Sequence, residues 1–215
     1  GADLHFIEGC SAPKYNVANL HAGAVELFVG KNAHLRYSTI ENWSKNMYNL
    51  NTKRSTCDEG GSIEWVSGSF GSHVGYLYPM SILAGRKSTC TFTGITFAGT
   101  GQNLDTGCKV GLAAPETSAS IETKSISKGG GVSTFRSSVV ATPKAENSAC
   151  SVSCQSLMLD DHSRSDTIPA MDIRCKHVDI GHEATIGRIG DDKVFYLMSR
   201  GVSEEEARTM IVNGF

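Results

Sequence analysis

The 215-residue sequence lacks the features that mark several common classes of protein. Its formal net charge of −2 gives no electrostatic basis for binding nucleic acid or an anionic membrane. No apolar run approaches the roughly 18 residues of a membrane helix, and the N-terminus does not have the layout of a signal peptide. No two cysteines form a CxxC pair, which argues against a zinc ribbon or a thioredoxin-type site. We therefore expect a cytoplasmic protein that binds neither nucleic acid nor membrane.

The seven cysteines are odd in number and irregularly spaced, which argues against a disulfide framework. Cys150 and Cys154 stand four residues apart in SACSVSCQS, a strand-like segment. Alternation along a strand would put both thiols on the same side as Val152. We expect reduced thiols, most of which act as small buried hydrophobic side chains.

Strand-like runs separated by glycine turns fill the chain from Ala24 to Ile189. This spacing fits a sandwich, a barrel or a β-helix. Three features favour the β-helix: many hydroxyl residues in the runs, no Asn-Gly or Asp-Gly hairpin pair in this region, and only five prolines in the chain. The prediction is an all-β parallel β-helix over residues 1–190, with on the order of eight coils about 4.8 Å apart.

A helix is predicted at the end of the chain. Ser203 and Glu206 have the spacing of a capping box, and Ala207, Met210 and Ile211 give one apolar face. The helix could simply cover the open end of a β domain. We assign residues 191–215 instead to the beginning of a C-terminal helical domain, and we expect the chain to be a fragment of a larger protein.

Segments along nearly the whole chain resemble the SufB/SufD family, and most closely its SufB branch, the scaffold subunits of the SUF iron–sulfur cluster assembly system. The resemblance implies a right-handed parallel β-helix flanked by smaller terminal domains. The segments that carry it are EGCSAP (8–13), LHAGAVEL (20–27), ENW (41–43), YNLNTKR (48–54), FAGTGQNLDTG (97–107), TKSISKGGG (123–131), LDDHSRSDTIP (159–169), GHEAT (181–185), FYLMSRGVSEEEA (195–207) and MIVNGF (210–215).

The resemblance assigns roles to four residues near the two ends of the β-helix. Cys10, in a Gly-Cys-Ser-Ala-Pro loop, matches the cysteine that accepts sulfur as a persulfide. Cys154 matches the cysteine that holds the nascent cluster, and Glu183 matches a carboxylate required nearby. His182 lies beside Glu183, where a histidine satisfied within the core is an equally good interpretation. Thiolates with harder N or O ligands suit a cluster that must later leave.

Glu41, Trp43 and Lys53 match polar positions on a sulfur path between the two thiols. Relatives often have glutamine at the position of Glu41. From the residues alone, Trp43 could be a core side chain, Lys53 a solvated charge and Glu41 a strand-end carboxylate.

The leading interpretation is a non-enzymatic scaffold that carries a transient iron–sulfur cluster. Its implied partners are a SufC-type ATPase docked on Ser203–Phe215, a SufD-type paralogue or a second copy, and a sulfur donor system, with reduced flavin a candidate electron source. One alternative is a SufD-like stabilising subunit, which would lack the cysteine matching Cys154. Another is a β-helix carbohydrate-active enzyme. Such an enzyme would align its acidic residues along one outer groove, whereas Asp160 and Asp161 would point to opposite faces of a strand.

The chain separation of the two thiols also predicts geometry. Cys10 and Cys154 should lie several coils apart, roughly 25–35 Å along the axis, which is beyond the reach of a disulfide or of one shared cluster. Cys154 should lie about one coil from Glu183 and His182.

Overall fold

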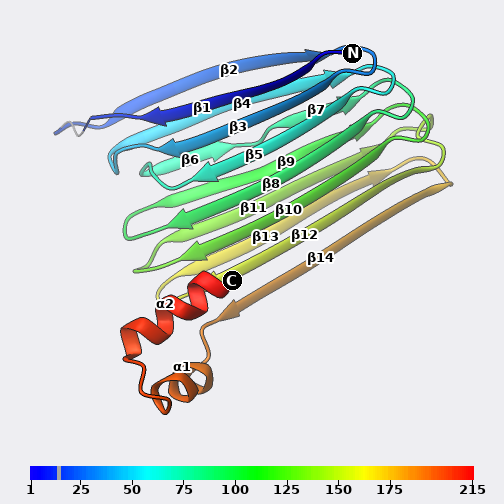
Figure 1. Cartoon of the computed structure of the whole chain (residues 1–215). Helices are drawn as coiled ribbons and strands as arrows, with labels where there is room; N and C mark the ends of the chain where they lie inside the picture. The colour runs from blue at the N-terminus through cyan, green and yellow to red at the C-terminus, as the bar shows by residue number, and fades with distance from the viewer. Residues whose placement is uncertain (14–15) are drawn as a thin grey trace.

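The computed structural model describes residues 1–13 and 16–215 and shows a parallel β-helix followed by two short helices (Figure 1). The described strands are β1 (Asp3–Ser11), β2 (Asn19–Val29), β3 (His34–Asn42), β4 (Met47–Cys57), β5 (Ser62–Ser69), β6 (Val74–Leu77), β7 (Met80–Leu83), β8 (Thr89–Ala98), β9 (Asn103–Leu112), β10 (Ser118–Ser127), β11 (Val132–Ala141), β12 (Ser148–Met158), β13 (Arg164–Ile173) and β14 (Val178–Arg188). The helices are α1 (Asp191–Met198) and α2 (Glu204–Gly214).

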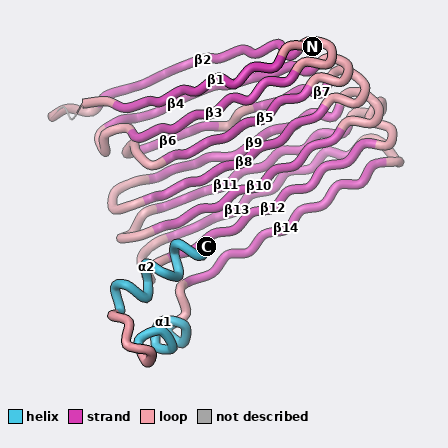
Figure 2. The backbone as a smooth tube through the Cα atoms, viewed as in Figure 1, coloured by secondary structure: helices cyan, strands magenta, loops and turns pink. Residues whose placement is uncertain are grey.

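The strands form two parallel sheets that face each other across a narrow interior (Figure 2). The first sheet has the order β1-β3-β5-β8-β10-β12-β14, and the second has the order β13-β11-β9-β6-β4-β2, with β7 paired to β4 and β9. The predicted all-β parallel β-helix is therefore confirmed. The predicted number of coils is wrong: the solenoid has about six turns, not eight. Each turn takes about 30 residues, since Cys90 pairs with Ala119 and Ala119 with Cys150.

Alternation along each strand decides which side chains enter the interior. In β8, for example, Cys90, Phe92, Thr96 and Ala98 are buried, whereas Thr91 and Ile95 on the opposite face are exposed. This is the two-residue period of a pleated strand with one face turned to the core.

One corner of the solenoid holds the turns in register. Five stacked residues have positive φ, and each donates its backbone N–H to a carbonyl in the next turn over 2.8–3.2 Å. Gly60 adopts this conformation without steric cost, whereas the four other residues carry a side chain into the left-handed region. The stack consists of Asn32, Gly60, Lys87, Glu116 and Asn147.

The C-terminal helices agree in part with the sequence-based expectation. The capping box is confirmed, since the Ser203 hydroxyl accepts from the Glu206 backbone N–H and the Glu206 carboxylate accepts from the Ser203 N–H. Ala207 is fully buried, but Met210 is 53% exposed, and α1 was not expected. Lys124 on β10 donates to the Phe215 carbonyl oxygen at 2.6 Å. Among the described residues, no helix has the length and apolar character needed to cross a membrane.

Candidate functional site

The inner face of the first sheet brings Cys10 and Cys154 onto one surface. Because the parallel strands pair in register, equivalent residues of successive turns stack in columns about 4.8 Å apart. Two neighbouring columns contain mostly hydroxyl-bearing side chains between the two cysteines, and we call them the hydroxyl columns. The first is Cys10, Glu41, Ser69, Thr96, Ser125 and Ser156, and the second is Glu8, Thr39, Ser67, Gly94, Thr123 and Cys154.

The two thiols are five strand-to-strand steps apart, from β1 through β3, β5, β8 and β10 to β12. At about 4.8 Å per step this is about 24 Å, close to the lower end of the expected range. That separation exceeds by far the Cα distance of about 7 Å that a disulfide tolerates. Cys10 and Cys154 therefore cannot ligate one cluster within this chain.

The other half of the interior is an ordinary hydrophobic core. We call its two columns on the same sheet the apolar columns: Tyr37, Trp65, Phe92, Ile121 and Val152, and beside them Leu35, Ile63, Cys90, Ala119 and Cys150. Burial raises the pKa of the Cys57 thiol and of the Cys150 thiol to about 12. These thiols are neutral packing groups at neutral pH, in agreement with the interpretation of most cysteines as structural.

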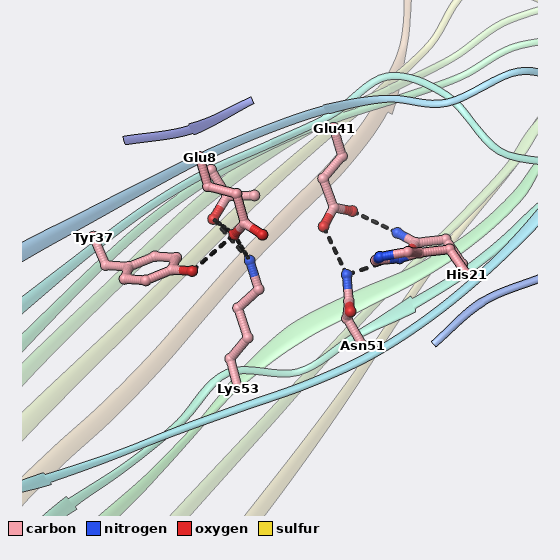
Figure 3. A network of polar contacts seen from close by, with 8 residues as sticks. Glu8, His21, Tyr37, Glu41, Asn51 and Lys53 are labelled. Carbon is pink, nitrogen blue, oxygen red and sulfur yellow. Dashed lines mark hydrogen bonds and ion pairs between the residues drawn. The ribbon is translucent and has the colours of Figure 1, made fainter. Parts of the chain in front are cut away.

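Lys53 and Glu8 form an ion pair (Figure 3), and Glu8 lies two residues before Cys10 on β1. Lys53 on β4 is only 2% exposed, and its Nζ atom lies 2.6 Å from the Glu8 carboxylate and 2.9 Å from the Thr39 hydroxyl. The Tyr37 hydroxyl donates to the same Glu8 oxygen at 2.8 Å. Burial acts to raise the pKa of Glu8, but the hydrogen bonds from Lys53 and Tyr37 outweigh it and hold that pKa below its usual range. Lys53 is therefore a buried partner of Glu8 and not a solvated charge.

Glu41 forms a second polar group in the same region. It is 3% exposed, and it accepts from the Asn49 amide at 2.6 Å and from the Asn51 amide at 3.1 Å. Burial raises the pKa of Glu41 against the opposing effects of Lys53 and the two amides. The His21 Nδ1 atom lies 2.9 Å from the Asn49 Oδ1 atom. The centre of the His21 ring lies 4.5 Å from the centre of the Trp43 ring. The three residues expected on the sulfur path thus lie at one end of the β-helix, around Cys10.

Cys10 lies on strand β1 and not in the loop that the sequence led us to expect; its side chain is partly buried, and the residue pairs in register with Glu41 on β3. Burial, together with the negative charges of Glu8 and Glu41, raises its pKa to about 11. Cys10 is therefore a protonated thiol at neutral pH in this structure. The charge on the adjacent carboxylates controls how readily it becomes a nucleophilic thiolate.

Two small cavities lie along the hydroxyl columns between the thiols. The first, of about 10 Å³, is lined by Glu41 and Asn49. The second, also of about 10 Å³, is lined by Gly94, Thr96 and Thr123. Ser69, Leu77 and Thr106 line both cavities, which are therefore adjacent. Each is about the size that holds one water molecule.

Cys154 is 2% exposed and enters the interior at the far end of the columns. Its sulfur lies 3.4 Å from the Thr167 hydroxyl on the opposite sheet, and it stacks directly on Thr123. On the next strand it pairs with Ala184. His182, two residues earlier on that same inward face, is a diagonal neighbour at about 8 Å by strand geometry.

Glu183 lies next to Cys154 in the strand register but on the other face of the sheet. It pairs with Ser153 and is exposed, because successive side chains alternate between the two faces. Across the part of the chain that the structure describes, no three His, Cys, Asp or Glu side chains are close enough together to hold a metal ion. Cys154, His182 and Glu183 thus lie within one coil of each other, as expected, without forming a ready-made ligand set.

Three buried side-chain polar atoms among residues 1–13 and 16–215 have no hydrogen-bond partner: Trp43 Nε1, Thr123 Oγ1 and His182 Nε2. Trp43 belongs to the Cys10 end, whereas the other two flank Cys154. An orphaned buried polar atom is costly and rare in folded proteins. Sequence reasoning missed Thr123, and it missed Glu8, Asn49 and Asn51. Their signal was a polar residue at an inward position of a strand.

The fold and the site together define a parallel β-helix with two distant thiols on one hydroxyl-lined inner face. The family model described as the SufBD core domain of SUF system FeS cluster assembly matches residues 1–215. An iron–sulfur cluster assembly SufBD family protein of Staphylococcus aureus (strain MRSA252) is 46% identical over all of this chain, and one of Staphylococcus epidermidis is 45% identical. The chain belongs to the SufBD family, and it spans 46% of the length of these relatives.

Proposed function

We propose that this chain is the β-helix core of a SufB-type scaffold, in which Cys10 accepts sulfur and Cys154 holds the nascent iron–sulfur cluster. The observation that carries the proposal is the placement of both thiols on one inner face, joined by the hydroxyl columns. Hydroxyl groups can donate hydrogen bonds to an anionic sulfur species, which aliphatic side chains such as Ile121 and Val152 cannot do. The presence of a cysteine at position 154 favours the SufB branch over the SufD branch.

The charged groups around Cys10 would control the first step of this function, since the carboxylates of Glu8 and Glu41 keep the thiol protonated. An acceptor thiol attacks a persulfide as a thiolate, so its pKa decides the rate. Glu8, Glu41 and Lys53 together set that pKa. Sulfur would then move past Glu41 and along the hydroxyl columns toward Cys154.

At the other end, Cys154 supplies a soft sulfur ligand for iron. His182 faces the same interior with a free Nε2 atom, and Glu183 reaches the outer surface of the same strand. Iron is the substrate of the assembly reaction, and its remaining ligands would come from sulfide and from a partner surface at this last strand. A mixed set of soft and harder ligands lets a cluster be released to an acceptor.

Anaerobic reconstitution of the intact protein with iron and sulfide, followed by absorbance at the cluster bands, tests the proposal. Cys154→Ser should abolish cluster formation. Cys90→Ser is the matched control, since Cys90 is equally buried on the inner face of the same sheet but belongs to the apolar columns. Equal cluster yields in the two variants, with both shown to be folded by circular dichroism, would contradict the assignment.

We further propose that the terminal helices belong to the docking surface for the ATPase subunit of the SUF system. Phe195 is 72% exposed and Tyr196 57% exposed on α1, and Met210 is exposed on α2. Exposed apolar side chains of this kind mark interaction surfaces. In calorimetric titration with the ATPase, this chain should bind more weakly than the full-length protein. Equal affinity would count against the proposal.

A further inference from the structure

The cavity beside Thr123 has the size and the unpaired donor expected of a site that binds one negatively charged atom. Thr123 is 8% exposed, its hydroxyl oxygen has no partner, and its side chain lines the cavity. Burying a hydroxyl without a hydrogen bond is unfavourable, so this hydroxyl is expected to form a hydrogen bond with a molecule bound in the cavity.

Gly94 forms part of the wall of the cavity. It stacks directly on Thr123, and a Cβ atom at this position would lie 2.8 Å from the Phe92 ring and 3.3 Å from the Thr123 methyl group. Its φ is not in the left-handed region, so the backbone does not require glycine here. The reason for glycine at position 94 is therefore the close approach of the Phe92 ring, which lines the cavity together with Thr123.

Cys154 is the neighbour of Thr123 on the other side, one strand-to-strand step away. The Cys154 sulfur already contacts one hydroxyl, that of Thr167 at 3.4 Å. A persulfide sulfur attached to Cys154 extends about 2 Å beyond the first sulfur, and on this face the nearest unused donor is the Thr123 hydroxyl.

Resting on the proposed function, we infer that Thr123 and Gly94 form a site for sulfane sulfur, in which the Thr123 hydroxyl donates to the terminal sulfur of a persulfide on Cys154. In the transfer step the Cys154 thiolate attacks the terminal sulfur of an incoming persulfide. A new sulfur–sulfur bond forms at Cys154, the donor's sulfur–sulfur bond breaks, and the donor leaves as a thiolate that takes up the proton released by Cys154. Oxidation states are exchanged between the two cysteines, so no further oxidant or reductant takes part.

The site is tested by anaerobic treatment of the intact protein with cysteine persulfide, followed by peptide mass spectrometry that counts added sulfur at Cys154 and Cys10. Thr123→Val removes the donor at nearly constant volume and should lower the persulfide yield at Cys154 about tenfold, as expected for the loss of one hydrogen bond to an anion. Thr123→Ser keeps a hydroxyl and should restore most of the yield. Loading at Cys10 should stay unchanged in both variants.

Gly94→Ala should also lower loading at Cys154, because the new Cβ would force the Phe92 ring and the Thr123 side chain, which line the cavity, to shift. Its matched control is Gly111→Ala on β9, where the nearest atom to a new Cβ is 3.9 Å away. Thr134→Val controls for the hydroxyl, since Thr134 is 7% exposed but lies on the outward face of β11. If Gly94→Ala does not fold, the comparison of Thr123→Val with Thr123→Ser decides.

Equal loading of Cys154 in wild type, Thr123→Val and Thr123→Ser would overturn this inference and leave the cavity as a site for water only. A wild-type protein that takes up no sulfur at Cys154 would instead contradict the proposed function itself. The two failures are therefore distinguishable in one experiment.

Discussion

The apolar columns and the hydroxyl columns lie on the same strands, a few residues apart, yet their side chains are stabilised in the interior in different ways. Ile121 and Ser125 both point inward from β10, and both are more than nine-tenths buried. The isoleucine gains free energy simply by leaving water. The serine must recover its lost hydration through the Ser156 hydroxyl at 2.8 Å. We therefore expect the apolar half to stabilise the fold more strongly, while the hydroxyl half fits the sulfur chemistry proposed above.

The largest effect should come from shortening a side chain in the apolar columns. Ile121→Ala leaves a cavity in a rigid stack, so the free energy of unfolding should fall by about 3 kcal/mol. Ser125→Ala on the same strand removes neutral hydrogen bonds to Ser156 at 2.8 Å and to Ser133 at 3.4 Å, and it should cost only about 1 kcal/mol. Urea denaturation measures both. An equal loss in the two variants would break the distinction between the halves.

The hydroxyl half has one exception, the ion pair beside Cys10. Lys53→Met keeps the volume of the side chain but leaves the Glu8 carboxylate without its cation, and we expect a loss of about 2 kcal/mol. The cost is below that of a fully enclosed pair because Glu8 keeps 26% of its side-chain surface exposed. Adding Glu8→Gln should restore part of the stability. Lys31→Met is the control, since the Lys31–Glu59 pair is exposed and its loss should be within measurement error.

No loss of stability in Lys53→Met would mean that the desolvation cost of Lys53 already cancels its attraction to Glu8. In that case the ion pair would serve only to control the charge beside Cys10.

The smallest effect concerns the acidity of Cys10. Its pKa is about 11, raised by burial and by the carboxylates of Glu8 and Glu41. The negative charge of Glu41 is one cause of this raised pKa, so Glu41→Gln removes a repulsion against the thiolate and the pKa of Cys10 should fall. Its alkylation at a fixed pH below that pKa should therefore become faster, as followed by mass spectrometry of the Cys10 peptide. Glu64→Gln on β5 should change nothing, and a Cys10 rate that is unaffected by Glu41→Gln would contradict the electrostatic argument.

Part of the site could be expected from the sequence because strands obey a period of two. Cys150 and Cys154 were expected on the same face of a strand because they are four residues apart, and both are buried in the interior. The same period separates His182 from Glu183, so the structure places them on opposite faces. The expected number of coils was wrong because the number of residues in a turn depends on the corners of the solenoid. These corners are held by backbone hydrogen bonds between successive turns, which no local sequence pattern predicts.

The sequence by itself determined the class of fold, the capping box at Ser203 and the relationship to the SufBD family, because alternation, capping and residue identity are local properties of the chain. Only the tertiary structure decided which residues share a column. Cys10 and Glu41, like Thr123 and Cys154, become neighbours through parallel pairing of residues about 30 positions apart in the chain. That register depends on every corner in between, and it is what turns scattered serines and threonines into one continuous surface between two thiols.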